Sequence, residues 1–223
     1  MSTISLSKLR KLPYHERWKL VSTSPTWPSE AKKIIEDYPK WEHEKIEKKI
    51  VKAGFATASM FITYDSINAY RLCSMLMNKI HKEEKEYGTW MTFYPSEYTD
   101  IIQYFIPSLT KLPLIDINKK AIEILVKTIV ECYHEEMKIL DVIKDTNFLT
   151  PFLVGSINCI NALINCSLAR DSLIDFNLIA NAMFEYLYDD LTLKTIFKLK
   201  NKITDHKLLQ EINDQIIMYD IIT

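Results

Sequence analysis

The stretch from Pro151 to Ala169 contains no charged side chain, although 26% of the residues in the chain are charged. Its first residues are typical of a helix N-terminus: the Thr150 hydroxyl can accept a hydrogen bond from an unpaired amide of the first turn, and proline suits the first helical position. Arg170 and Asp171 follow its last apolar residue. We therefore predict a helix over Pro151–Ala169 that is buried on most of its sides.

This helix has two different apolar faces. At helical spacing, one face carries large side chains, namely Leu153, Ile157, Ile160, Ile164 and Leu168. The opposite face carries small ones, namely Gly155, Cys159, Ala162, Cys166 and Ala169. Small side chains allow a neighbouring backbone to come close, so we expect one neighbour to approach closely along Gly155, Cys159, Ala162 and Cys166. Both faces need cover, which makes this the central helix of the fold.

The rest of the chain also favours helices. Only 3 of its 223 residues are glycine, far below the usual ~7%, and tight hairpins and phosphate loops need more. A helix is predicted from Trp41 to Gly88 with a break near Gly54 or Asp65, and another from Pro95 to Pro107 with Ser96 as its cap. A third is predicted from Asn118 to Lys144. After the central helix, three further helices are predicted, which begin at Ser172 or Asp175, at Thr192 and at Asp205. We therefore predict an all-α bundle of roughly seven to nine helices.

The N-terminal segment differs in composition from the remainder. Residues 1–40 contain four prolines and the aromatic residues Trp18 and Trp27, which indicates an irregular arm with a short helix from Ser29. A tryptophan is too apolar to remain in water without cause. The arm is expected either to pack on the body of the protein or to contact a partner. Residues 41–223 are predicted to form a single helical domain.

Charge and cysteine content limit the setting in which the protein works. The 28 Lys and Arg residues nearly balance 29 Asp and Glu residues, so no strong field attracts nucleic acid. No stretch is apolar enough to span a membrane, and the N-terminus lacks the apolar core of a secretory signal. The four cysteines form no C-x-x-C pair and are expected to be buried thiols. We expect a cytoplasmic protein in a reducing compartment.

One pair of residues has the spacing of a metal site. Glu131 and His134 have the Glu-x-x-His spacing of ferritin-like di-iron bundles, with Glu185 as the obvious partner. On a helical wheel, however, all three point away from the apolar stripes of their helices, whereas a bundle metal site needs ligands that project inward. No nucleophile elbow, phosphate loop or dinucleotide motif occurs. The sequence predicts no catalytic residue and no cofactor.

Polar residues on the central helix are the other unusual feature. Asn158, Asn161 and Asn165 follow one edge of it. Buried amides need hydrogen-bond partners, so they either meet polar groups of neighbouring helices or border a groove that binds a ligand or peptide. Glu136 lies at the edge of its helix's apolar stripe and needs a partner or water.

The order of features from Asp145 to Phe197 resembles the Bcl family of apoptosis regulators. A turn at Lys144–Phe148, the uncharged central helix, and a following segment with Tyr186-Leu187, Asp190-Leu191 and Ile196-Phe197 match that family's pattern. Leu149 and Thr150 replace the Gly-Arg of its motif, so the arginine that pairs with a bound death-motif helix is absent. The resemblance implies a divergent, poxvirus-type soluble member that binds signalling proteins through other faces.

These observations favour a non-enzymatic protein–protein interaction module, expected to be a viral Bcl-like modulator of host apoptosis or innate signalling. Its partner would be a host protein or a second copy of the chain. The residues expected to contact a partner are Trp18, Trp27, Asn158, Asn161 and Asn165. Two alternatives stay open. One is a ferritin-like metal-dependent oxidoreductase. The other is a viral or mobile-element structural or nucleic-acid-binding protein with a one-sided lysine patch, made of Lys32, Lys33, Lys45, Lys48, Lys49 and Lys52.

Overall fold

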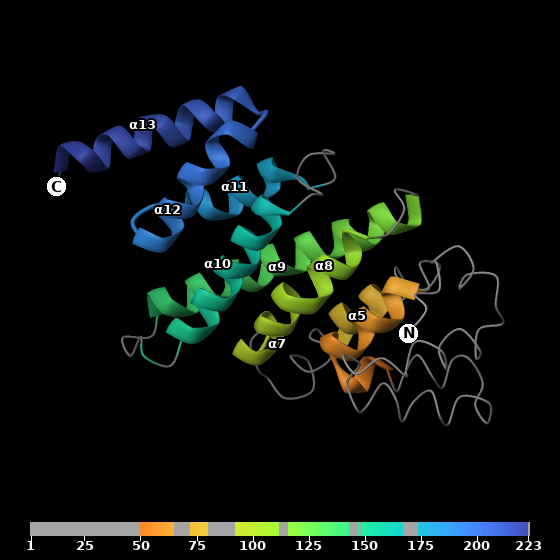
Figure 1. Cartoon of the computed structure of the whole chain (residues 1–223). Helices are drawn as coiled ribbons and strands as arrows, with labels where there is room; N and C mark the ends of the chain where they lie inside the picture. The colour runs from red at the N-terminus through yellow and green to blue at the C-terminus, as the bar shows by residue number, and fades with distance from the viewer. Residues whose placement is uncertain are drawn as a thin grey trace, which may run out of the picture. The chain divides into compact units, whose positions relative to one another are not determined.

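The structure is a computed structural model that describes residues 50–64, 72–79, 92–111, 116–142, 147, 149–166 and 174–222. In these residues all regular secondary structure is helical, which confirms the all-α prediction (Figure 1). Not one of the described helices is both long and apolar enough to cross a membrane. The predicted arm over residues 1–40, with Trp18 and Trp27, lies outside the described residues.

Two compact units divide the chain, and each is described by itself. The first comprises Met1–Lys79 and Asp100–Ala121, and the second comprises Ile80–Thr99 and Ile122–Thr223. In the first unit, α5 (Phe55–Tyr64) packs against the π-helix η3 (Ile101–Phe105) and α8 (Ile106–Leu109). The rings of Phe55 and Phe105 meet edge to face with centroids 5.2 Å apart.

A helix break at Gly54 was predicted and is confirmed. Residues 50–53 are helical, Gly54 has φ +90°, and α5 begins at the next residue. Only glycine adopts this left-handed backbone without steric strain. The alternative break near Asp65 falls outside the described residues.

The helix predicted between Pro95 and Pro107 differs in two ways from expectation. It begins as α7 (Pro95–Asp100), so Ser96 lies inside it and is not the cap; instead the Glu97 carboxylate accepts from the Tyr94 amide at 3.0 Å. It also continues through Pro107 to Leu109. Proline lacks an N–H and its ring would meet the carbonyl four residues earlier. The wider π-helical turn η3 directly before it relieves that conflict.

The long helix α9 (Asp116–Val142) supplies much of the core of the second unit. The sequence predicts an apolar stripe of six residues on this helix, and five of them, Ile122, Val126, Ile129, Tyr133 and Met137, are each at most 2% exposed, whereas the sixth, Leu140, is half-buried. The Tyr133 hydroxyl lies 2.9 Å from the Thr192 hydroxyl, which joins α9 to α12 (Asp190–Leu199).

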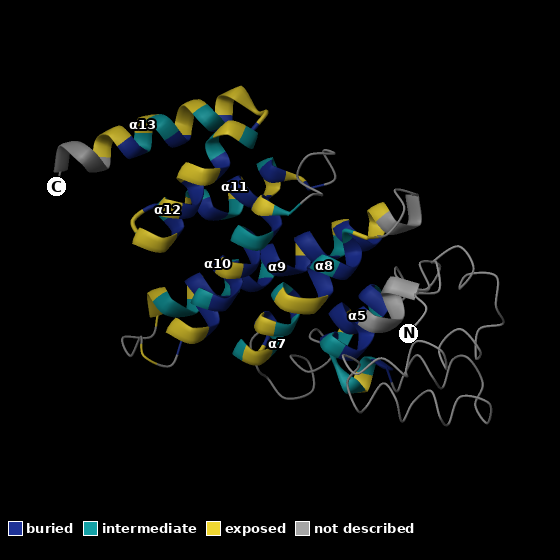
Figure 2. Cartoon of the chain, viewed as in Figure 1, coloured by how far each residue is buried: buried dark blue, intermediate teal, exposed yellow. Residues whose placement is uncertain are grey.

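The central helix α10 spans Thr150–Asn165 and is shorter than predicted. Leu149 stands at the N-cap position, not Thr150, and Pro151 lies one residue further into the first turn. Cys166 is already extended, with ψ 164°, so the helix does not reach Ala169. Large parts of α10 are nevertheless buried, as the dark blue segments in Figure 2 show.

Three helices complete the second unit. Asp175 caps α11 (Phe176–Phe184) by accepting the Leu178 amide at 3.0 Å, as one of the two predicted starts implied. Asp189, and not Thr192, precedes α12 and accepts the Thr192 amide at 2.7 Å. Asp205 precedes α13 (His206–Ile222) as predicted. Helix α12 packs against both α10 and α11, and α11 also contacts α13.

Candidate binding groove and buried carboxylate cluster

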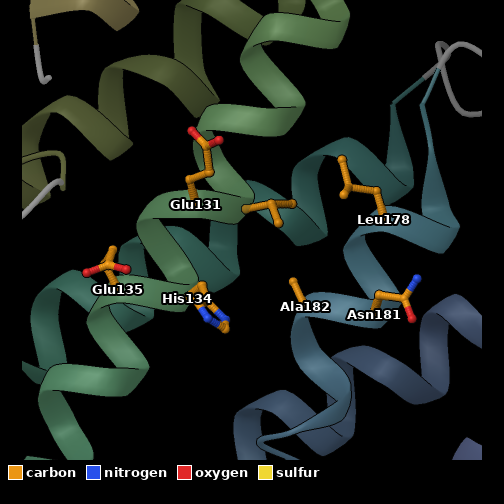
Figure 3. Close-up of a pocket in the computed structure, with 7 residues that line it drawn as sticks. Glu131, His134, Glu135, Leu178, Asn181 and Ala182 are labelled. Carbon is orange, nitrogen blue, oxygen red and sulfur yellow. The ribbon is translucent and has the colours of Figure 1, made fainter.

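A groove with a volume of about 470 Å³ lies between α9 and α11 in the second unit. One wall comes from α9 and the other from α11 (Figure 3). The residues that line it are Val130, Glu131, His134, Glu135, Leu178, Asn181 and Ala182. Its apolar members differ in accessibility: Val130 is 6% exposed, whereas Leu178 is 38% exposed. The size falls in the range of small ligand pockets, ~300–1,000 Å³.

The charged side chains of the groove are acidic. Glu131 and Glu135 are one helical turn apart on the α9 wall, and neither lysine nor arginine is among the lining residues. Each carboxylate has a lysine on its own helix: Lys127 Nζ is 3.9 Å from Glu131, and Lys138 Nζ is 2.9 Å from Glu135. Such pairs, exposed to solvent, contribute only ~0–1 kcal/mol. A cationic side chain of a partner can therefore displace either lysine at little cost in free energy.

The three candidate metal ligands are not brought together. Glu131 and His134 both line the groove, but Glu185 is exposed at the C-cap of α11 and is not a lining residue. His134 instead meets the ring of Tyr186 with centroids 5.7 Å apart. Among the described residues, no three His, Cys, Asp or Glu side chains are grouped so that they could hold a metal ion.

The asparagine edge of α10 is less buried than its sequence suggested. Asn158 and Asn165 are exposed, and Asn161 is half-buried. The Asn161 amide donates to Thr195 Oγ1 at 3.3 Å, and its oxygen accepts from Lys198 Nζ at 2.8 Å. The edge therefore faces α12 and solvent, and none of its asparagines lines the groove. Their role in binding a partner stays a prediction.

The side chain of Glu136 contacts three hydroxyl groups. The sequence had indicated that this residue needs a partner or water. It is 1% exposed. Its Oε1 accepts from Tyr98 Oη at 2.5 Å and from Thr92 Oγ1, and its Oε2 lies 2.5 Å from Ser156 Oγ. The partners come from α7, from the segment before it, and from α10. We call these four residues the Glu136 cluster.

Burial dominates the electrostatics of the Glu136 cluster. It raises the pKa of Glu136 above the ordinary value, and the hydrogen bonds that Glu136 makes with Ser156, Thr92 and Tyr98 lower the pKa only in part. Burial, followed by the proximity of Glu136, likewise raises the pKa of Tyr98 and of Cys159. Tyr98 and Cys159 therefore keep their protons at neutral pH.

The small-residue face of α10 contacts Tyr98 of α7 at two of its residues. A Cβ atom placed on Gly155 would lie 2.3 Å from Cδ2 of Tyr98, so only glycine fits beneath this ring. One turn further along α10, Cys159 Sγ donates to the Tyr98 carbonyl at 3.7 Å. The predicted close neighbour is thus confirmed at Gly155 and Cys159, whereas Ala162 and Cys166, further along the same face, are half-buried. Cys73, Cys132 and Cys159 are buried free thiols, as expected, whereas Cys166 is a free thiol that is only half-buried.

Comparison with known proteins assigns the chain to no family. No protein-family model matches it. Neither the curated proteins nor the solved structures include a significant match. The groove and the Glu136 cluster are therefore the features of the described residues that bear on function.

Proposed function

We propose that this chain is a non-enzymatic protein–protein interaction module that binds a peptide segment of a partner in the groove between α9 and α11. The observation that carries the proposal is an apolar groove of about 470 Å³ with two carboxylates on one wall and no cationic lining residue. Helix pairs of this kind accept an apolar side chain of a partner segment as an anchor. We further propose that this module is a viral, Bcl-like modulator of host apoptosis or innate signalling, and the sequence resemblance over Asp145–Phe197 supports this.

The groove indicates the chemistry of the bound segment. Val130, Leu178 and Ala182 offer an apolar surface for a Leu, Ile or aromatic side chain. Glu131 and Glu135 favour a Lys or Arg one helical turn from that anchor, because opposite charges across an interface raise the association rate and select partners. The expected ligand is therefore a short basic amphipathic segment of another protein.

Binding can be measured with a display library of basic amphipathic peptides, followed by titration of selected peptides against the purified full chain. Leu178→Arg places a charge on the apolar wall and should weaken binding of the selected peptides at least about tenfold, equivalent to ~1.4 kcal/mol. Val142→Arg is the matched control, since Val142 is apolar, 82% exposed and not a lining residue. It should leave affinity unchanged.

The contribution of the Glu131 and Glu135 carboxylates to binding can be tested separately. The double variant Glu131→Gln and Glu135→Gln should lower the association rate and flatten its dependence on salt, because screening weakens exposed charge pairs. Peptides that bind the wild type, the Leu178→Arg variant and the double variant equally well would show that the binding face lies elsewhere. Peptides carrying the death motif serve as a separate arm, since they test the Bcl-like assignment without testing the groove.

A further inference from the structure

If Glu136 is ionised, the hydrogen-bond contacts that the hydroxyl groups of the Glu136 cluster make with the carboxylate and with the Leu153 carbonyl outnumber the protons of these hydroxyl groups. Ser156 Oγ lies 2.5 Å from Glu136 Oε2 and 3.0 Å from the Leu153 carbonyl oxygen. A hydroxyl has only one proton to donate. If Glu136 were ionised, Ser156 would have to share its one proton between the carboxylate and the Leu153 carbonyl, and each of the two hydrogen bonds would be weaker than an unshared one.

A proton on Oε2 resolves this geometry. Glu136 then donates to Ser156 Oγ, and Ser156 donates to the Leu153 carbonyl. The other carboxyl oxygen, Oε1, still accepts from Tyr98 and Thr92. Every hydroxyl of the cluster thereby has one donor role, and the chain of hydrogen bonds runs from α9 into α10.

The surroundings of Glu136 also favour the neutral form. The two lysines that form ion pairs on α9, Lys127 and Lys138, are bonded to Glu131 and Glu135. The described titratable groups that act on Glu136 or respond to it are Tyr98 from α7, Cys132 from α9 itself and Cys159 from α10. All three are buried and neutral at pH 7, so none of them compensates a negative charge. Burying an uncompensated carboxylate is costly, and such a group keeps its proton instead.

We propose that Glu136 is a neutral carboxylic acid at physiological pH, with its proton donated from Oε2 to Ser156, and that its ionisation is a pH-sensitive device that loosens α7 and α10 from α9. The direction of the effect follows from linkage. In the unfolded chain Glu136 loses its proton near 4.5, its ordinary pKa, whereas in the folded chain it keeps the proton to a higher pH. Between these two values the folded state binds more protons, so the free energy of unfolding falls as the pH rises.

Glu136→Gln is the variant that tests the device. Its amide reproduces the neutral acid, since Nε2 can donate to Ser156 and Oε1 can accept from Tyr98 and Thr92, and it does not titrate. The midpoint of thermal unfolding of the full chain should fall less steeply with rising pH in the variant than in the wild type. Glu135→Gln is the matched control on the same helix, and should keep the wild-type slope because Glu135 pairs with Lys138 near the surface.

Infrared spectroscopy reports the protonation state directly. At pH 7 the wild type and Glu135→Gln should show the stretching band of a protonated carboxyl group, and Glu136→Gln should lack it. A wild type without this band, or a Glu136→Gln variant that retains it, would overturn the proposal.

If Glu136→Gln does not fold, NMR of wild-type protein labelled with ¹³C at the glutamate carboxyl carbons decides alone. One resonance that stays in the protonated position while the others titrate supports the proposal. Glutamate resonances that all titrate together near the ordinary pKa overturn it. These measurements involve no partner, so they are independent of the proposed binding function.

Discussion

Gly155 lies beneath the ring of Tyr98, and a methyl group has no room there. Gly155→Ala would gain up to ~1 kcal/mol in helix propensity. The overlap outweighs this gain, because the Tyr98 ring is buried and its hydroxyl is bonded to Glu136. We expect a net loss of about 1–3 kcal/mol in the free energy of unfolding, measured by urea denaturation. Asn158→Ala, at an exposed position on the same helix, is the control and should be neutral or slightly stabilising; an equally stable Gly155→Ala variant would contradict the contact.

A second prediction at this scale concerns the hydroxyl of Tyr98. Tyr98→Phe removes one of the donors to the buried Glu136 and should lower the free energy of unfolding by about 1–3 kcal/mol. Tyr188→Phe is a matched control. It removes a hydrogen bond to Asp141 of 2.6 Å, but Tyr188 is 51% exposed and water can replace it. Tyr188→Phe should lower the free energy of unfolding clearly less than Tyr98→Phe does. Equal losses would show that burial does not make the hydrogen bond of the Tyr98 hydroxyl more stabilising than an exposed one.

At the scale of elements, the start of α12 depends on one side chain. The Asp189 carboxylate accepts the Thr192 amide, whereas the adjacent Asp190 lies in the first turn. Asp189→Ala should cost about 1 kcal/mol as a lost N-cap. Asp190→Ala should cost only a few tenths of a kcal/mol through the helix dipole. Urea denaturation of both variants checks the difference, and a larger loss for Asp190→Ala would contradict the assigned cap.

Local patterns predicted many elements because their causes are local. The apolar periodicity of α9, the caps Asp175 and Asp205, and the left-handed Gly54 all depend on a few neighbouring residues. The continuation through Pro107 was not predictable in this way, since it needs the π-helical turn η3. The early end of α10 at Asn165 was also missed, because the absence of charge continues beyond the point where the helix stops.

The candidate sites depend on long-range contacts, and this explains what the sequence left open. The sequence showed that Glu136 needed a partner, but Thr92, Tyr98 and Ser156 lie 44, 38 and 20 residues away from it. A hydroxyl residue gives no local sign that it faces a carboxylate. The groove similarly combines side chains from α9 with side chains from α11. The sequence anticipated one wall of the groove in part, because the helical wheel placed Glu131 and His134 on the side of their helix that points away from the core.

For the whole molecule, the division into two compact units leads to a prediction about stability. Phe105 is fully buried against Phe55 in the first unit. Phe105→Ala should cost about 3–5 kcal/mol there. Hydrogen exchange followed by mass spectrometry should show faster exchange in α5 and α8, with a smaller change in α12. Ile160→Ala, a buried position on α10, should give the reverse pattern, and equal acceleration in both units for either variant would show that the chain unfolds as one.

The contact between Gly155 and Tyr98 also has an evolutionary consequence. A lineage that acquires a larger residue at position 155 must accept a smaller one at position 98, and then the hydroxyl donated to position 136 is lost as well. We therefore expect positions 98, 136, 155 and 156 to change together among descendants of a common ancestor. A profile weighted on these four positions would recover distant relatives that overall sequence identity misses.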